Sequence, residues 1–163
     1  MDGQTALEVR IYQRLSRAVS DFEWLYTGGT PFFDNLDEYA SRIFPEDHIK
    51  WFMEKYTEPR PLIVCSGRYG NSLKTHERWT IVVDQPFLWV PGGLRHEDLA
   101  PFPMKLTDKE YVFLDDSCYR GRTRDKIRQR IEQAGGTLIN SMVLYDSSVK
   151  SLPNFDVIYR YHK

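Results

Sequence analysis

The sequence predicts an α/β fold, in which a mainly parallel, twisted sheet is flanked by helices and preceded by an N-terminal helical segment. Three observations support this prediction. Apolar residues recur at helical spacing through the first 60 residues, and short continuous apolar runs, typical of buried parallel strands, follow them. Residues 111–145 then read as strand, loop, helix and strand, and this βαβ order requires parallel strands.

Three helices are expected in the first 60 residues. The longest covers residues 4–25, and two shorter ones cover 34–43 and 46–57. Pro45, followed by two acids, favours the start of the third helix, because acids are stabilised near the positive end of the helix dipole. The apolar face of the first helix consists of Leu7, Ile11, Leu15, Val19 and Phe22.

The character of the sequence changes after residue 61. A continuous apolar run at 62–65 predicts a buried strand, and 66–71 reads as a loop. Further strands are expected at 79–83 and 87–90. Residues 92–108 form a long polar stretch with prolines, and long loops of this kind often act as lids over a site.

The last part of the chain carries the βαβ unit. We expect strands at 111–114 and 138–145, joined by a helix at 123–134, and a final strand at 155–161. Two glycines at 135 and 136 supply the C-terminal stop of that helix.

Length and composition set further limits. A chain of 163 residues suits a single domain, with a helical part at 1–60 and an α/β core at 61–163. The net charge of −1 gives no support for general nucleic-acid or membrane binding. No apolar stretch approaches the roughly 18 residues that span a bilayer, and residues 1–7 lack a signal-peptide pattern. Cys65 and Cys118 form neither a disulfide framework nor a zinc motif, so we expect a reduced, cytoplasmic setting.

The stretch at 111–123 carries the chemistry. An apolar strand delivers Asp115 and Asp116 to its C-terminal end, which is where open α/β sheets bind ligands. Gly121 lets the backbone approach a ligand closely, and a helix N-terminus at Thr123 offers free N–H groups to a phosphate. The segment therefore combines acids for hydroxyls or Mg²⁺ with a cradle for an anion.

Each of these features has an ordinary structural explanation. An Asp at a strand end often caps a turn, and a glycine before a helix is common. A dense run of basic residues extends from Arg120 to Arg130. Beyond Arg122, a solvated helix face is a slightly better interpretation than binding to an anionic partner such as a polyphosphate or RNA. The four histidines have no metal-ligand spacing. The order of acids, glycine and helix start after one strand is much harder to ascribe to accident.

The segment resembles the phosphoribosyl-pyrophosphate (PRPP) motif of the type I phosphoribosyltransferases. The nearest variant has the form DD-x-x-Y-T-G-R-T, typical of the pyrimidine attenuator and uracil phosphoribosyltransferase group, and the likeness covers residues 111–161. The resemblance implies that Asp115 and Asp116 face the ribose 2′- and 3′-hydroxyls. It also implies a 5-phosphate loop of Ser117, Cys118, Tyr119, Arg120, Gly121, Arg122 and Thr123.

The same resemblance implies three further parts. A flexible lid falls at 91–105, where Arg95 and His96 can reach a pyrophosphate, and a hood over the base falls near 145–155 with help from the first 60 residues. Arg68 is implied to stabilise the leaving pyrophosphate, together with Asp115 and Asp116 as catalytic residues. The pyrophosphate loop comprises Ser66, Gly67, Arg68, Tyr69 and Gly70.

The sequence departs from the family in three places. Arg120 replaces the usual Thr or Ser before the glycine, and residues 71–78 look too short and polar for a helix that packs on the sheet. Tyr119 occupies the position where enzymes for 6-oxopurines place an Asp, which disfavours that subgroup.

The expected function is a PRPP-dependent transfer of a 5-phosphoribosyl group to a nucleobase, with release of pyrophosphate. Mg²⁺ is expected as the cofactor, held through the ligand and at most indirectly by Asp115 and Asp116, with no direct protein ligand. The alternative is a catalytically degenerate protein that binds PRPP or a nucleoside monophosphate and regulates through RNA or protein contacts. A plain interaction protein is a third reading, and a homodimer is compatible with the sequence.

Overall fold

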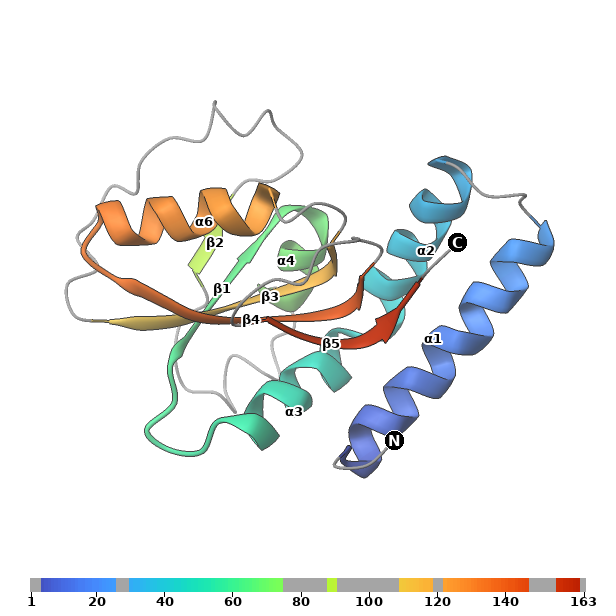
Figure 1. Cartoon of the computed structure of the whole chain (residues 1–163), viewed down its shortest axis with the longest axis horizontal. Helices are drawn as coiled ribbons and strands as arrows, with labels where there is room; N and C mark the ends of the chain where they lie inside the picture. The colour runs from blue at the N-terminus through green and yellow to red at the C-terminus, as the bar shows by residue number, and fades with distance from the viewer. Residues whose placement is uncertain are drawn as a thin grey trace.

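Five parallel strands form the sheet of the computed structural model (Figure 1). The strand order is β2-β1-β3-β4-β5, and each neighbouring pair is parallel. The strands are β1 (Leu62–Ser66), β2 (Leu88–Val90), β3 (Glu110–Cys118), β4 (Thr137–Asp146) and β5 (Phe155–Arg160). The structure describes residues 4–25, 30–74, 88–90, 109–118, 122–146 and 155–161.

Helices cover both faces of this sheet. On one face lie α1 (Ala6–Leu25), α2 (Thr30–Ile43), α3 (Pro45–Lys55) and α4 (Gly67–Lys74), and α6 (Arg122–Gln133) lies on the other. Figure 1 shows the sheet between α6 and the helices α1 to α3. The predicted α/β class with a parallel sheet and an N-terminal helical segment is confirmed.

The larger core lies between the sheet and the first four helices. It contains Ile11 and Leu15 of α1, Phe52 of α3 and Leu114 of β3, none of which is exposed to solvent. A smaller core joins Ile127 and Ile131 of α6 to the opposite face, where the partners are Val64, Tyr111, Phe113 and Leu138. Because buried apolar surface dominates the stability of a fold, the N-terminal helices are an integral cover of the sheet.

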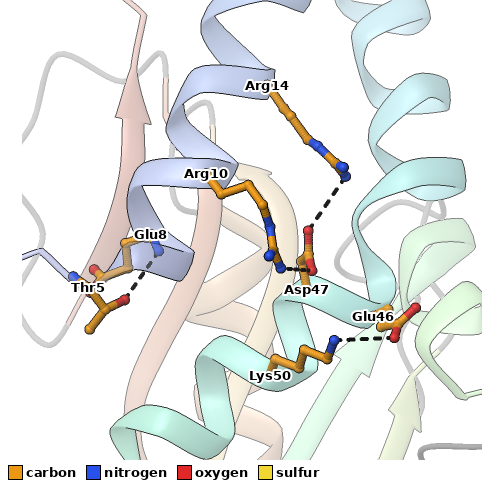
Figure 2. Close-up of polar contacts among 7 residues, drawn as sticks. All are labelled: Thr5, Glu8, Arg10, Arg14, Glu46, Asp47 and Lys50. Atoms are coloured by element: carbon orange, nitrogen blue, oxygen red, sulfur yellow. Dashed lines mark hydrogen bonds and ion pairs between the residues drawn. The ribbon is translucent and has the colours of Figure 1, made fainter.

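Ion pairs hold α1 against α3 beside this core. Arg10 Nη2 lies 2.7 Å from Asp47 Oδ1, and Arg14 Nη1 lies 3.7 Å from Asp47 Oδ2 (Figure 2). At the start of α1, the Thr5 and Glu8 side chains each accept the other residue's backbone N–H, at 3.1 and 3.2 Å. This reciprocal capping box satisfies two backbone donors that a helix N-terminus leaves free.

The βαβ prediction is also confirmed, since β3, α6 and β4 follow one another and the two strands are parallel. The predicted glycine stop is correct: Gly135 has a φ of 93°, and the Gly136 N–H donates to the Ile131 carbonyl at 2.9 Å. The expected strand at 79–83 and the whole polar stretch at 92–108 lie outside the described residues.

Two local predictions are wrong. Residues 67–70, expected in a loop, form the first turn of α4, which starts directly after β1. This helix is not wholly polar, because Tyr69 and Leu73 are buried on its inner face. The second error concerns residues 115–118, which continue β3 as a strand because they pair with β4 up to Cys118 and Asp146. Among the described helices, none is long and apolar enough to cross a membrane.

Candidate functional site

The sheet has a topological switch point between β1 and β3. From β1 the chain crosses to β2 on one side, whereas β3, β4 and β5 follow on the other side. In open α/β sheets, ligands bind at such a point, beyond the C-terminal ends of the two strands. The strand order therefore locates the candidate site without reference to any motif.

Two of the predicted segments meet at this point. β1 pairs with β3 in a register that ends at Val64 and Phe113, and Ser66 and Asp115 each lie two residues further along. The Ser66–Gly70 turn and the acids of β3 are thus neighbours, although nearly 50 residues separate them in the chain. The structure brings together the segments expected for pyrophosphate and ribose.

The end of β3 presents two adjacent carboxylates. The Asp116 backbone N–H donates to Asp115 Oδ1 at 2.9 Å, and the Ser117 hydroxyl donates to Asp116 Oδ1 at 3.3 Å. Both carboxylates are partly buried, and within the described part of the chain no Lys, Arg or His pairs with either. The pair is held by its own backbone and by Ser117.

This arrangement disfavours full ionisation. Burial raises the pKa of Asp115 well above its usual value, and the negative charge of Asp116 raises it further, with a smaller contribution from Asp37 of α2. Burial also raises the pKa of Asp116, while hydrogen bonds from Asp115 and Ser117 oppose that shift. Two such groups favour a shared proton until a cation or a set of hydroxyls compensates their charge.

The turn after β1 is constrained from several directions. Gly67 has a φ of 63°, a left-handed conformation that is costly for residues with a Cβ. Ser66 is buried, and the Cys65 thiol donates to the Gly70 carbonyl at 3.4 Å. The first turn of α4 lies at the switch point, and helix N-termini present backbone donors that favour anions.

A buried histidine contacts this turn through Tyr69. His48 of α3 is fully buried; its Nδ1 lies 2.5 Å from the Tyr69 hydroxyl and its Nε2 lies 2.8 Å from the Met142 carbonyl oxygen of β4. Burial lowers the pKa of His48 to about 4. The sequence analysis missed this residue, because a lone histidine on the apolar face of a helix gives no signal beyond burial.

Several predicted residues cannot be placed. Tyr119, Arg120 and Gly121 of the phosphate loop lie outside the described residues, as do Arg95 and His96 of the predicted lid. The backbones of Arg68, Arg122 and Thr123 belong to α4 and α6. Cys118 lies at the end of β3, where it is buried and forms no disulfide.

Neither metal ligands nor the two cavities of the described ranges coincide with the predicted site residues. No three His, Cys, Asp or Glu side chains of these ranges converge in a way that could hold a metal ion. Two surface cavities of about 550 and 480 Å³ lie along α1 and α3, the second reaching β5. Neither is lined by a predicted site residue, so strand topology locates the site better than these hollows do.

Solved structures share this arrangement of strands and helices. A purine phosphoribosyltransferase from Pyrococcus horikoshii superimposes with a TM-score of 0.56 at 20% identity, over 73% of this chain and 84% of the other. The chain has a phosphoribosyltransferase fold. UMP synthase from Leishmania donovani gives a TM-score of 0.51 at 13% identity, over 74% of this chain and 27% of that one. An HPRT alanine mutant gives 0.52 at 11% identity, over 78% and 80%.

No protein-family model and no curated protein sequence matches the chain. The likeness to the phosphoribosyltransferase fold is therefore one of structure, at identities of 20% or less. A shared fold does not fix an activity, which depends on the residues at the site.

Proposed function

We propose that this chain is a PRPP-dependent phosphoribosyltransferase that transfers a 5-phosphoribosyl group to a nucleobase and releases pyrophosphate. The observation that carries the proposal is the Asp115–Asp116 pair, which lies at the β1–β3 switch point beside the turn that follows β1. A phosphoribosyltransferase fold and a PRPP-like segment that begins at these acids both support it.

The acids are assigned to the ribose. Carboxylates accept hydrogen bonds from the 2′- and 3′-hydroxyls, and those bonds are strong because the acceptor is charged. A cationic ribosyl centre that develops during the reaction would also be stabilised by two nearby carboxylates. Burial and the charge of Asp116 raise the pKa of Asp115, and hydroxyl donors or a cation bound beside the pair would favour its ionised form.

The phosphates are assigned to the two helix N-termini. The segment 119–123, which leads into α6, is proposed to hold the 5-phosphate, and the Ser66–Gly70 turn at the start of α4 is proposed to hold pyrophosphate. Arg68 would stabilise charge on the leaving pyrophosphate, with Arg95 and His96 as further candidates from a lid.

Mg²⁺ fits the donor set of this site. Carboxylate oxygens are ligands that Mg²⁺ prefers, and it is commonly bound through one or two carboxylates together with substrate phosphates rather than in an all-protein cage. Asp115 and Asp116 would hold it indirectly or through the ribose hydroxyls. When bound, Mg²⁺ would neutralise charge on the pyrophosphate.

The nucleobase is proposed to be a pyrimidine rather than a 6-oxopurine. Tyr119 stands where the 6-oxopurine enzymes place an acid, and the DDSCYRGRT stretch is nearest to the uracil and pyrimidine attenuator variant. A reduced, cytoplasmic setting is also proposed, because Cys65 and Cys118 are each buried and form no disulfide.

A binding protein without turnover is the second candidate. It is favoured by Arg120, which replaces the small hydroxyl residue that the resemblance predicts in the phosphate loop. Such a protein would bind PRPP or a nucleoside monophosphate and respond through RNA or protein contacts. Arg128, whose side chain is partly exposed, and the helices of residues 1–60 are candidates for these contacts, whereas Arg124 is buried and does not belong to a solvated helix face.

Calorimetric titration with PRPP, with and without Mg²⁺, tests the site. We expect Mg²⁺-assisted binding that Asp115→Asn/Asp116→Asn weakens at least about 100-fold, since each lost charged hydrogen bond is worth roughly 1.5–3 kcal/mol. Asp21→Asn/Glu54→Gln, which neutralises two exposed acids of α1 and α3, is the matched control and should bind normally.

Pyrophosphate release in the presence of uracil and other bases then separates the two candidates. Release supports the enzyme, whereas tight binding without release supports the second candidate. Failure of the wild-type protein to bind either PRPP or nucleoside monophosphates would contradict both.

A further inference from the structure

His48 connects three separate elements at the back of the candidate site. It belongs to α3, its Nδ1 contacts the Tyr69 hydroxyl of α4 at 2.5 Å, and its Nε2 contacts the Met142 carbonyl of β4 at 2.8 Å. The rings of His48 and Tyr69 are 5.5 Å apart, and Tyr69 is almost fully buried. One side chain thus fixes a distance between the helical layer, the sheet and the turn after β1.

The hydrogen bonds of His48 have only one consistent direction. A carbonyl oxygen can only accept, so Nε2 carries the proton and donates to Met142. In the neutral ring Nδ1 is then the acceptor, and the Tyr69 hydroxyl donates to it. Burial supports this neutral form, because it lowers the pKa of His48 to about 4. Tyr69 is therefore held in one orientation.

Tyr69 lies within the turn proposed to bind pyrophosphate. It is the third residue of α4, which begins at Gly67 directly after β1 and has only eight residues. The negative charges of Asp116 and Asp115 are close enough to raise the pKa of the Tyr69 phenol, beyond the larger effect of burial. A displacement of Tyr69 would therefore move the turn relative to both acids.

We infer that His48 is a positioning residue which, through Tyr69, holds the Ser66–Gly70 turn at a fixed distance from Asp115 and Asp116 and thereby sets the affinity for the pyrophosphate end of the ligand. This inference rests on the proposed function. A packing role alone would be met by an apolar side chain of similar size, whereas His48 makes polar contacts with two other elements in a fully buried position.

The test compares variants that remove the same kind of contact at two places. Tyr69→Phe deletes only the hydroxyl that donates to His48, and His48→Leu deletes both ring contacts. His48→Asn keeps an acceptor near the position of Nδ1 and serves as the conservative variant. The matched control is Tyr56→Phe, because the Tyr56 hydroxyl also takes part in a hydrogen bond, with Asn140 Nδ2 at 3.0 Å, at the start of β4 and away from the site.

Three ligands separate the parts of the site in calorimetric titrations: inorganic pyrophosphate with Mg²⁺, ribose 5-phosphate, and PRPP with Mg²⁺. We expect Tyr69→Phe and His48→Leu to weaken pyrophosphate and PRPP about tenfold, while ribose 5-phosphate binding changes less than about twofold. His48→Asn should recover part of the lost affinity, and Tyr56→Phe should bind all three ligands as the wild type does.

The outcomes distinguish this inference from the proposed function. If the wild-type protein binds neither PRPP nor pyrophosphate, the proposed function itself fails. If the wild type binds but both variants retain its pyrophosphate affinity, the inference is wrong. Equal losses for pyrophosphate and ribose 5-phosphate would also overturn it, because they would indicate a general loss of structure. Tyr69→Phe keeps the test decisive even if His48→Leu does not fold.

Discussion

Asp47 is buried and Asp115 is partly buried, yet the surroundings of the two carboxylates are opposite. Asp47, on α3, lies 2.7 Å from a nitrogen of Arg10 and 3.7 Å from one of Arg14 (Figure 2). Asp115, at the end of β3, has a second acid as its neighbour, and its pKa is raised by burial and by that acid. The first carboxylate is matched by partners of its own chain, and the second is not matched within the described residues.

This difference separates a charge compensated by the fold from one that the described residues do not compensate. A buried charge is tolerated when it is paired, whereas adjacent like charges destabilise the folded state. Natural proteins accept such local conflicts mainly at functional sites. Under the proposed function, the ion pairs of the N-terminal helical layer stabilise the fold itself, while the acids at the end of β3 are compensated by a ligand.

The largest expected effect on stability comes from acidification of His48. Its pKa is about 4 in the folded protein against 6.5 as the ordinary value, so the unfolded chain binds the proton first as pH falls. The contribution of neutral His48 to the free energy of unfolding is fully present above pH 6.5. It is lost progressively as pH falls toward 4, by on the order of 3 kcal/mol. Urea unfolding of the wild type and His48→Gln across this range measures the difference in slope.

The His48→Gln comparison isolates one residue, because the other three histidines and all acids remain in both proteins. The difference between the two free energies of unfolding should shrink as pH falls from 6.5 to 4. Parallel curves would show that His48 takes up its proton equally in the folded and unfolded states. In that case the burial of neutral His48 would contribute nothing to the stability of the helical layer.

The next effect is a loss of stability on Asp47→Asn. The substitution removes the charge that pairs with Arg10 and Arg14, whose side chains are 49% and 50% exposed. Because solvent screens these half-exposed partners, we expect a loss of only roughly 1–2 kcal/mol. Thermal unfolding at pH 7 measures it, with Asp21→Asn in the exposed part of α1 as the control. An unchanged melting temperature would mean that hydration stabilises Arg10 and Arg14 as much as their ion pairs with Asp47 do.

The sequence predicted the architecture well because the periodic apolar residues that encode it are the ones that become buried. Leu7, Ile11, Leu15 and Val19 face the core as expected. The acids of β3 were found because a strand end followed by a glycine and a helix has a local signature. The neighbouring turn was located through the resemblance, and its position beside the acids follows from β1–β3 pairing.

The errors arise where long-range pairing overrides local composition. Asp115 to Cys118 look like a loop because they are polar, yet pairing with β4 extends the strand. Residues 67–70 contain two glycines and look like a loop. They form the first turn of α4 instead, because a helix at this place buries Tyr69 and Leu73 against the core. His48 could not be predicted, because its partners Tyr69 and Met142 lie 21 and 94 residues away.

The smallest expected effect comes from Asp115→Asn. This Asp-to-Asn change should increase stability, whereas the same change at Asp47 should decrease it. The raised pKa of Asp115 means that the folded protein holds a proton which the unfolded chain releases near the usual carboxyl pKa of 3.8. Stability therefore falls as pH rises above the usual carboxyl pKa, and this penalty is present at neutral pH. Asp115→Asn removes the penalty, so we expect a gain of roughly 1 kcal/mol at pH 7, or about 2–4 °C in melting temperature.

The gain should disappear as pH falls below about 4, where the wild-type carboxyl is protonated in both states. Calorimetric melting of the two proteins at pH 7 and pH 3.5 tests this pH dependence directly. A variant that melts higher at neutral pH and binds PRPP more weakly would show that the acids are retained for a ligand at the expense of the apo fold. If Asp115→Asn instead lowers the melting temperature at pH 7, as Asp47→Asn is expected to do, Asp115 has a stabilising partner in the folded protein and the contrast between the two carboxylates is wrong.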